Sequence, residues 1–328
     1  MVKIAINGLG RIGRNILKIA LEKGVNIVAV NDLTDLKNLV YLIKYDSVYG
    51  NYEGKIQSGK DFIKINNKKI KVFSESDPQN LPWGDLGIDI VIESTGRFGD
   101  RKDAERHLKA GAKRVVITAS GKDPDITVVM GVNNDKIKKT DKIISNASCT
   151  TNCLTPIVKI LDDAYGIKKG FMTTVHGYTS SQSLIDSPSK KFRRGRAAAN
   201  NIVPTTSGAT NATTQVLPNL KGKIDGLAFR VPILTGSIVD FVAELEKQPT
   251  KEQINNLFKK SASGKLKGIL DYTEDELVSS DIIGNSHSSI VDGSLTQVIG
   301  NTVKILSWYD NEYGYSARVV DLVKYLGK

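Results

Sequence analysis

Hydrophobic residues follow two different periods in the first half of the chain. Val2–Asn7 and Ile27–Val30 are short, mostly apolar runs, which is typical of strands buried on both faces. Between them, Arg11–Lys23 repeats its apolar residues three and four positions apart, as one face of a helix does, and Gly24 ends the pattern. Strands that alternate with helices predict an α/β domain with a parallel sheet covered on both faces. Up to residue 148 the same interpretation predicts helices at Leu36–Tyr45 and Lys102–Ala110, strands at Ile88–Ile92, Val115–Thr118, Ile126–Met130 and Lys142–Ser145, and a hairpin of Phe62–Ile65 and Ile70–Phe73 around Asn66-Asn67.

The pattern changes after residue 148. A long helical stretch at residues 149–165 is followed by segments in which strand patterns dominate, and this predicts an α+β domain with a mainly antiparallel sheet. A polar, basic stretch at residues 178–201 has little periodicity and is too long for an ordinary connection, so it is either functional or mobile. The expected elements are strands at Lys168–His176, Gly226–Val231, Ser237–Leu245, Ile290–Asp292, Gln297–Ile299 and Thr302–Trp308, and helices at Lys251–Ser261 and Tyr315–Leu326.

These patterns predict two domains. Residues 1–148 form the first and residues 149–311 the second, and the C-terminal helical segment 312–328 is expected to pack back on the first.

Composition narrows the class of protein. The 328 residues are 40% hydrophobic and 25% charged, as in ordinary globular proteins. No apolar run approaches the ~20 residues that span a bilayer, and the N-terminus lacks a signal-peptide layout. Only two cysteines are present, four residues apart, so we expect a reducing, cytoplasmic setting and no membrane association.

The chain is basic. Lys and Arg number 46 against 35 Asp and Glu, a net charge of +11. Such a charge suits phosphate-bearing ligands and nucleic acid equally well, although most of the excess is scattered lysine of the kind found on solvated surfaces.

A glycine motif, Gly8-Leu-Gly10-Arg-Ile-Gly13, follows the first strand and opens the first helix. In this setting Gly8 permits a tight turn, Gly10 lets the backbone approach a pyrophosphate, and Gly13 lets the helix lie close to the sheet. Asp32, after the second strand, is placed to accept hydrogen bonds from a ribose, and its charge would repel a 2′-phosphate. The unit therefore predicts a Rossmann-type domain that binds NAD rather than NADP, with a lesser alternative in which Asp32 only caps the next element.

The segment Ser145–Cys153 carries the most specific chemistry. Cys149 stands where a helix is expected to begin, and the positive end of the helix dipole favours a thiolate there. A thiolate attacks carbonyl carbon, so Cys149 is the candidate nucleophile. Cys153 lies one turn deeper in the helix and is expected to pack in the core.

Of the three histidines, His176 is the candidate base. It ends the strand that follows the Cys149 helix, where it could take the thiol proton. His107 and His287 are interpreted as surface residues. Two cysteines and three scattered histidines do not form a ligand cluster, so no metal site is expected.

Several residues could hold phosphate groups. Arg230 stands in the otherwise apolar Phe229–Pro232, where an arginine needs an anion. The run Lys190–Arg196 packs five basic residues into seven, of which Arg194 is the favoured ligand contact; a solvated or nucleic-acid-binding patch is the alternative. Hydroxyl and backbone donors are expected from Ser148, Thr150, Thr151, Thr179, Ser207 and Gly208.

Five segments together resemble one family over essentially the whole chain. These are Ile6–Arg14, Ser145–Cys153, Thr174–His176, Arg193–Ala199 and Trp308–Tyr315, and they are similar to phosphorylating glyceraldehyde-3-phosphate dehydrogenase. The resemblance implies NAD-dependent oxidation of glyceraldehyde-3-phosphate with inorganic phosphate to 1,3-bisphosphoglycerate, through a cysteine thiohemiacetal and thioester, by a homotetramer.

The resemblance also assigns roles to residues. Cys149 would be the nucleophile and His176 its activating partner, and residues 178–201 would form a loop that reaches a neighbouring subunit's cofactor site. The implied cofactor contacts are Gly8, Gly10, Arg11, Ile12, Gly13, Asp32, Thr95, Gly96, Thr118 and Asn311. The implied contacts to the substrate's phosphate and to the attacking phosphate are Ser148, Thr150, Thr179, Arg194, Ser207, Gly208 and Arg230.

Several positions depart from the usual pattern of the family. Ser76 replaces a common arginine, and Leu33 and Ser187 stand beside the ribose pocket, so the preference between NAD and NADP stays open. Ser181 replaces an acidic residue, Ser207 a threonine and Asn211 a lysine. The alternatives are an erythrose-4-phosphate or non-phosphorylating dehydrogenase, a nucleic-acid-binding secondary role, which we regard as unlikely, and a silent scaffold. The physiological direction of the reaction is also open.

Overall fold

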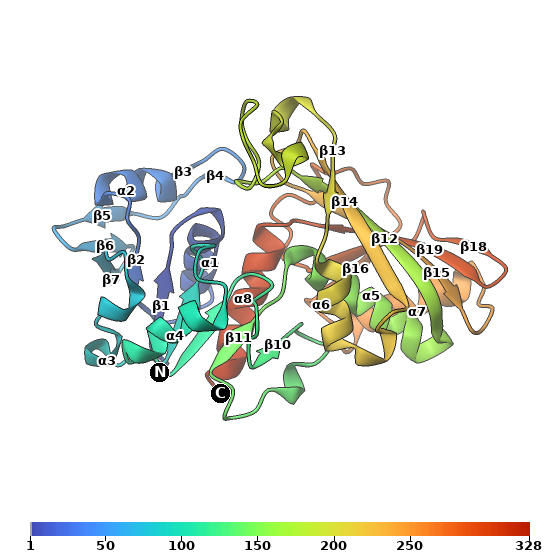
Figure 1. Cartoon of the computed structure of the whole chain (residues 1–328), viewed down its shortest axis with the longest axis horizontal. Helices are drawn as coiled ribbons and strands as arrows, with labels where there is room; N and C mark the ends of the chain where they lie inside the picture. The colour runs from blue at the N-terminus through green and yellow to red at the C-terminus, as the bar shows by residue number, and fades with distance from the viewer. Residues whose placement is uncertain (1) are drawn as a thin grey trace. The chain divides into compact units, whose positions relative to one another are not determined.

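The computed structural model describes residues 2–328, which form two compact units (Figure 1). The first comprises residues 2–128, 134–147 and 316–328, and the second residues 129–133 and 148–315. Each unit is built around its own large β-sheet. Most of the C-terminal helix, α8 (Tyr313–Leu326), belongs to the first unit, where Lys23 pairs with Asp321 of that helix at 2.9 Å.

The first unit contains a nine-stranded sheet, counted over the described residues. Neighbouring strands from β10 to β7 are parallel, and β6 and β5 extend that edge antiparallel. From edge to edge the strands are β10 (Ile126–Thr127), β11 (Ile143–Ser145), β9 (Arg114–Ile117), β8 (Ile90–Glu93), β1 (Ile4–Asn7), β2 (Ile27–Asn31), β7 (Lys68–Phe73), β6 (Phe62–Ile65) and β5 (Ile56–Ser58). The chain moves outward from β1 through β2 and then crosses to β8 on the other side of β1. A sheet of this type binds ligands beyond the carboxyl ends of the strands at that switch point.

Apolar packing fixes the helices against this sheet. Every residue of β1 and β8 is buried, which explains their continuous apolar runs. Ala104 of the helix α4 packs with Val115, Ile117 and Ile143 of β9 and β11. The helices and short elements of the unit are α1 (Arg11–Glu22), α2 (Leu36–Lys44), α3 (Trp83–Leu86), α4 (Arg101–Lys109), the ribbon of β3 (Tyr45–Asp46) and β4 (Gly50–Asn51), and the 3₁₀ turns η1 (Pro78–Asn80) and η2 (Asn134–Lys136).

The second unit contains an eight-stranded, mainly antiparallel sheet, again counted over the described residues. Only the pairs β12–β14 and β16–β17 are parallel. In order the strands are β13 (Val203–Thr206), β14 (Ile224–Val231), β12 (Ile167–Gly177), β15 (Ser237–Leu245), β19 (Thr302–Tyr309), β17 (Ser289–Asp292) and β16 (Leu270–Thr273), with β18 (Gln297–Ile299) beside β19. The predicted fold class, a Rossmann-type sheet plus an α+β unit, is therefore confirmed.

The core of the second unit lies between this sheet and two helices. Leu154 and Leu161 of α5 pack with Phe241 of β15 and Phe258 of α7, and all four side chains are fully buried. The helices and 3₁₀ turns of the unit are α5 (Cys149–Tyr165), α6 (Ala209–Val216), α7 (Lys251–Ser263), η3 (Phe192–Gly195), η4 (Ala198–Asn200) and η5 (Pro218–Leu220).

Most predicted elements match the structure to within a few residues, and the Asn66-Asn67 hairpin is confirmed by the antiparallel β6–β7 pair. The strand predicted at Ile126–Met130 is shorter, because β10 ends at Thr127. The helix α6 was not predicted. Its sequence, rich in threonine and alanine, has no clear apolar stripe, and tertiary packing of Ala209 and Val216 supports it instead.

The two later glycines of the motif should differ in their effect on stability. A Cβ at Gly13 would stand 1.9 Å from the Gly8 carbonyl oxygen, whereas Gly10 has no atom within 4 Å of such a Cβ. We expect Gly13→Ala to lower the free energy of unfolding by about 3 kcal/mol, because the obstacle is backbone. Gly10→Ala should cost about 1 kcal/mol or less. Denaturant titration of both variants tests this, and equal losses would contradict it.

Candidate active site

The candidate nucleophile stands at the first residue of α5. Ser148 caps this helix, because its side chain accepts a hydrogen bond from the backbone N–H of Thr151 at 3.1 Å. Ala147 just before it has a φ of 54°, a left-handed conformation that a residue with a Cβ rarely adopts. Such strain occurs at functional sites, and here it turns the chain sharply into the helix that begins with Cys149.

Cys149 and His176 are in contact. The sulfur of Cys149 lies 3.4 Å from Nε2 of His176, which is almost completely buried near the end of β12, whereas Cys149 is half-buried. The aromatic ring of Tyr309 stands edge-on to the imidazole, with centroids 5.9 Å apart. The structure therefore brings together the thiol and the imidazole that the sequence singled out.

The register of two parallel strands places Arg230 beside His176. These residues are partners in the β12–β14 pair, and Nη1 of Arg230 lies 2.6 Å from Nδ1 of His176. The same guanidinium donates to the Gly177 carbonyl oxygen at 3.0 Å, and that oxygen is itself 2.6 Å from Nδ1. Nδ1 can serve only one of these neighbours: it accepts from Arg230 or, carrying a proton, donates to Gly177.

His176 is a neutral base at physiological pH. Burial, together with the charges of Arg230 and Arg194, lowers the pKa of His176 to about 3, although a hydrogen bond to Gly177 opposes this. An imidazolium beside two guanidiniums would be a third positive charge in a desolvated site. Burial and the two guanidiniums therefore disfavour an ion pair of thiolate and imidazolium in this site.

The thiol of Cys149 is less acidic than the sequence predicted. Burial raises its pKa, and the charge of Arg230 and hydrogen bonds from Thr150 offset this only in part. The helix N-terminus favours a thiolate, as the sequence predicts, but burial of the sulfur opposes it. Cys153 is fully buried, and burial raises its pKa to about 12, so its predicted place in the core is confirmed.

Arg194 and Arg230 form a positive site without carboxylate partners among the described residues. Arg194 is half-buried, donates to the Thr205 hydroxyl at 2.9 Å and to the Thr206 carbonyl oxygen at 3.3 Å, and has its pKa lowered by burial and by the charge of Arg230. Partly buried guanidiniums that lack an acid favour an anionic ligand. The pair is therefore a candidate anion site beside the cysteine and histidine.

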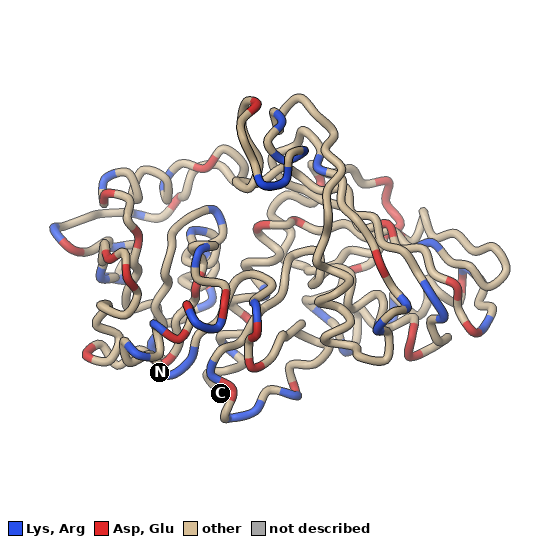
Figure 2. The backbone as a smooth tube through the Cα atoms, viewed as in Figure 1, with Lys and Arg blue, Asp and Glu red and all other residues tan. Residues whose placement is uncertain are grey.

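The rest of the basic run Lys190–Arg196 does not share this arrangement. Arg196 pairs with Asp186 at 2.7 Å, and Lys191 donates to the Thr206 hydroxyl at 2.6 Å, while Arg193 is exposed. Figure 2 shows that lysine and arginine are spread along much of the chain and interspersed with acids.

The hydroxyl residues predicted at the anion sites occupy several positions in the second unit. Thr150 shares a hydrogen bond with Tyr309 at 2.8 Å, and Thr179 shares one with Ser181 at 2.9 Å just after β12. Ser207 accepts from the Ala209 N–H and Gly208 caps α6, beyond β13. Within the described residues, Ser207 and Gly208 make no hydrogen bond to the cysteine–histidine pair.

The glycine turn opens into a hollow of about 240 Å³ in the first unit. Gly8 has a φ of 94°, and a Cβ there would stand 2.7 Å from the Thr95 nitrogen, so only glycine fits. The carboxylate of Asp32 accepts the Leu9 N–H at 2.6 Å and the Thr34 N–H at 2.9 Å, which ties the turn to the end of β2. The hollow is lined by Asn7, Gly8, Gly10, Asn31, Asp32, Leu33, Glu75, Ser76, Ser94, Thr95, Arg97 and Phe98.

This hollow fits a dinucleotide. It lies beyond the strand ends at the switch point, the N–H groups at the start of α1 have no partner within the helix, and the position of Gly10 is open. Asp32 uses its carboxylate as a cap, as the alternative proposed, and retains further acceptor capacity for a ribose.

The remaining predicted cofactor contacts are placed as follows. The side chain of Arg11 pairs with Asp46 at 2.8 Å. Ile12 is half-buried in the first turn of α1, and Gly96 has a φ of 71° in the loop after β8. Thr118, after β9, donates to the Glu93 carbonyl oxygen at 3.0 Å.

Asn311 belongs to the second unit, where it is buried. Its side-chain oxygen accepts from Ser237 at 2.8 Å and from Thr235 at 3.3 Å, so its amide orientation is fixed.

The structure corrects one histidine and adds polar residues that the sequence interpretation missed. His107 is fully buried, not on the surface, because it bonds Trp83 and Glu93 within the unit. Asn7 and Asn31, at the ends of β1 and β2, line the hollow. The sequence signal that could have identified Asn7 and Asn31 is a polar residue at the end of an otherwise apolar strand. His287 is half-buried and bonds Asn285.

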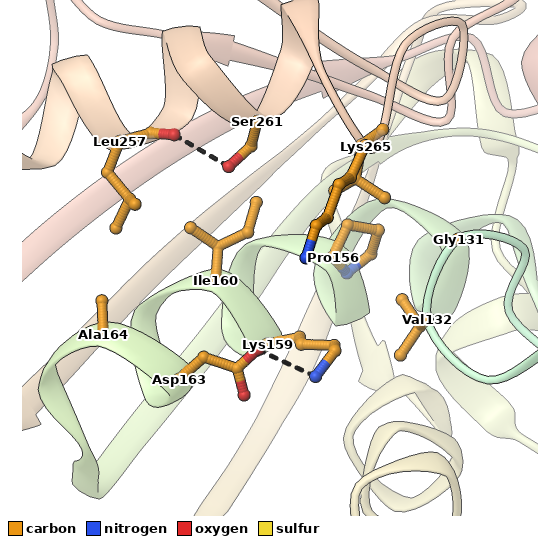
Figure 3. Close-up of a pocket in the computed structure, with 11 residues that line it drawn as sticks. Gly131, Val132, Pro156, Lys159, Ile160, Asp163, Ala164, Leu257, Ser261 and Lys265 are labelled. Atoms are coloured by element: carbon orange, nitrogen blue, oxygen red, sulfur yellow. Dashed lines mark hydrogen bonds and ion pairs between the residues drawn. The ribbon is translucent and has the colours of Figure 1, made fainter.

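A second hollow, of about 360 Å³, lies between α5 and α7 (Figure 3). Its walls are mostly apolar, Lys159 pairs with Asp163 at 2.9 Å, and Lys265 extends into it. It begins at Pro156, about 10 Å along the helix from Cys149 at the usual rise per residue. Its lining contains neither a cysteine nor a histidine, and it is not part of the catalytic group.

Two further observations concern the described residues. No three His, Cys, Asp or Glu side chains of residues 2–328 gather in a way that could hold a metal ion. None of the helices in this range combines the length and the apolar character that a membrane span requires.

The fold and the glycine turn define the class of the protein: a dehydrogenase with an NAD-binding domain. Family models agree with both units, since residues 2–101 match the glyceraldehyde 3-phosphate dehydrogenase NAD-binding domain and residues 148–311 match its C-terminal domain.

Similarity to known proteins covers essentially the whole chain. Similar proteins are the glyceraldehyde-3-phosphate dehydrogenases of Streptomyces coelicolor (55% identity, 99% of this chain and 98% of the relative) and Geobacillus stearothermophilus (54%, 99% and 98%). That of Borreliella burgdorferi is 55% identical, with 100% of both chains covered. The chain belongs to the glyceraldehyde-3-phosphate dehydrogenase family and is an NAD-dependent dehydrogenase of this type.

Alkylation should separate the two cysteines. Because burial raises the pKa of Cys149 and His176 is neutral, we expect its rate with iodoacetamide to rise steadily above neutral pH, with no reactive plateau between about pH 4 and 7. Cys153 should stay unmodified in the folded protein. Mass spectrometry of the wild type and of Cys153→Ser measures both rates. An acid-side plateau would show a resting thiolate–imidazolium pair.

Proposed function

We propose that this dehydrogenase catalyses the NAD-dependent oxidative phosphorylation of glyceraldehyde-3-phosphate to 1,3-bisphosphoglycerate. The observation that carries the proposal is the Cys149 sulfur 3.4 Å from His176 Nε2, beside two guanidiniums without acids. A nucleophile, a base and a site for two anions are the groups that this reaction needs.

Nucleophilic attack begins with proton transfer from Cys149 to His176. When Nδ1 donates to the Gly177 carbonyl oxygen, the lone pair of Nε2 faces the thiol and accepts its proton. The sulfur then adds to the aldehyde carbon, and the carbonyl oxygen becomes the oxyanion of a thiohemiacetal. The backbone N–H of Cys149 and the protonated His176 stabilise that oxyanion.

Anion binding and base activation are coupled through Arg230. A phosphate group attracts its guanidinium away from Nδ1, which frees Nδ1 to donate to Gly177 and removes the like charge that opposes a proton on His176. The base therefore becomes competent when an anion is bound at Arg230.

The second half of the reaction consumes inorganic phosphate. Bound NAD supplies the acceptor for the hydride whose loss converts the thiohemiacetal to a thioester. Arg194 and Arg230 hold the attacking phosphate, whose oxygen adds to the thioester carbon while the Cys149 sulfur leaves with a proton from His176. The products are the acyl phosphate and the free thiol.

Further expectations rest on the same proposal. NAD would lie on Gly8, Gly10, Asp32 and Thr95, with the start of α1 at the pyrophosphate. We propose the cytoplasmic homotetramer of the family, in which residues 178–201 reach a neighbouring subunit's cofactor site.

The activity is tested by NADH absorbance with glyceraldehyde-3-phosphate and phosphate, with NAD or NADP. Cys149→Ala should abolish turnover, because no other accessible thiol exists in the described unit, while NAD affinity stays within about twofold of the wild type. Assays with erythrose-4-phosphate, and without phosphate, are the comparison arms. A Cys149→Ala variant with near-normal turnover would refute the nucleophile.

The anion site is tested by two neighbouring arginines. We expect Arg194→Gln to lower kcat/KM by about 10- to 100-fold, the loss of one charge-assisted hydrogen bond to phosphate. Arg193→Gln, one residue away and exposed, is the matched control and should stay within about twofold. Steady-state kinetics in the aldehyde and in phosphate measure both, and equal losses would argue against a specific anion contact.

A further inference from the structure

A chain of buried polar groups lies behind the dinucleotide hollow. It begins at Trp83 of α3 and His107 of α4, which are both fully buried. The indole N–H of Trp83 lies 3.0 Å from Nδ1 of His107, and the ring planes are stacked with centroids 6.4 Å apart. Because an indole only donates, Nδ1 accepts, and the single proton of a neutral imidazole stands on Nε2.

The chain continues to Glu93, the last residue of β8. Its Oε2 accepts from Nε2 of His107 at 3.0 Å and from the Asn7 amide at 2.6 Å. Its Oε1 accepts from the Thr95 backbone N–H at 2.8 Å and from the Thr95 hydroxyl at 2.5 Å. All four partners are donors, so this buried carboxylate is satisfied only as an anion and only by these groups.

The other end of the chain is the wall of the hollow. Asn7, held by Glu93, accepts from the Asn31 amide at 2.7 Å, and Asn31 in turn bonds the backbone of Glu75 through both atoms of its amide. Thr95, held by Glu93, accepts the Arg97 N–H at 3.0 Å. Asn7, Asn31, Glu75, Thr95 and Arg97 all line the hollow, whereas Glu93 and His107 do not.

The same chain sets the position of the glycine turn. The Thr95 nitrogen stands 2.7 Å from where a Gly8 Cβ would be, and the Ser94 hydroxyl donates to the Gly8 carbonyl oxygen at 2.7 Å. Moving residues 94 and 95 therefore moves the surface on which Gly8 rests.

We propose that His107 and Glu93 are positioning residues for NAD, which act through Thr95 and Asn7 to hold the strand ends of the hollow in their binding geometry. Neither touches the hollow itself. The proposal rests on NAD as the cofactor and not on the identity of the aldehyde, so its test is NAD binding without substrate.

Each residue type in the chain is needed for its donors and acceptors. A glutamine at position 93 would turn one acceptor into a donor that faces two other donors, with the shape unchanged. A phenylalanine at position 107 would fill the space of the imidazole but give nothing to Glu93 or Trp83. A glutamine at position 107 offers a donor group to Glu93 and an acceptor oxygen to Trp83, the two functions that neutral histidine supplies there.

The experiment measures the Kd of NAD by calorimetry and the denaturation midpoint of each variant. Glu93→Gln should raise the Kd at least about tenfold, since one buried group loses its partner. Glu105→Gln is the matched control, the same change at a partly exposed position of α4 that pairs with Arg101 at 3.8 Å, and it should leave the Kd within about twofold. A Glu93→Gln Kd no higher than that of the control would overturn the proposal.

A second comparison separates positioning from general stability. His107→Phe should raise the Kd about as much as Glu93→Gln, and His107→Gln should restore most of the affinity. Val115→Ala, a buried core change elsewhere in the same unit, should lower the denaturation midpoint without a matching change in Kd. The proposal fails if Kd follows the midpoint across all variants, or if Phe and Gln at position 107 bind NAD equally well.

Discussion

The contact between Arg230 and His176 governs the catalytic unit. It arises from strand register, because β12 and β14 run parallel and place the two residues side by side. Burial and the guanidinium together lower the pKa of the imidazole, and the guanidinium itself lacks an acid to neutralise it. One contact thus creates both a base beside the cysteine and an unsatisfied positive charge that attracts phosphate. A strand shift of one residue would turn Arg230 to the other face and remove both properties.

In the first unit, a buried charge has all its hydrogen-bond partners within the protein, unlike the two arginines. Glu93 is as deeply buried as His176, yet its four acceptor positions are filled by protein donors, so it needs no ligand. The two arginines lack acidic partners, and they therefore attract anions. The Glu93 carboxylate has all its hydrogen-bond donors, and it therefore holds its neighbours in place. A buried charge with all its partners can hold the residues around a binding site in place, whereas a charge without partners can itself bind a ligand.

Local patterns made much of this predictable. The glycine motif, the start of α5 at Cys149 and the strand that ends near His176 follow from spacing over fewer than about thirty residues. The burial of His107 could not be predicted, because α4 is mostly charged and its histidine is buried by Trp83 and Glu93, which are distant in sequence. The raised pKa of Cys149 was missed for the same reason: desolvation depends on the packing of β12, β14 and β19 around the helix start, and the helix dipole alone suggested the reverse.

A thiol that is hard to ionise in the resting site fits the proposed chemistry. The desolvation that raises the pKa of Cys149 would also keep water away from a thioester at that sulfur. A well-hydrated thiol would ionise more easily, but its thioester would be exposed to hydrolysis. The neutral His176 resolves this conflict, because it removes the proton only as the sulfur attacks. In the proposed mechanism, the contact between that base and Arg230 restricts activation to the moment when an anion occupies the site, and the resting thiol stays protected between turnovers.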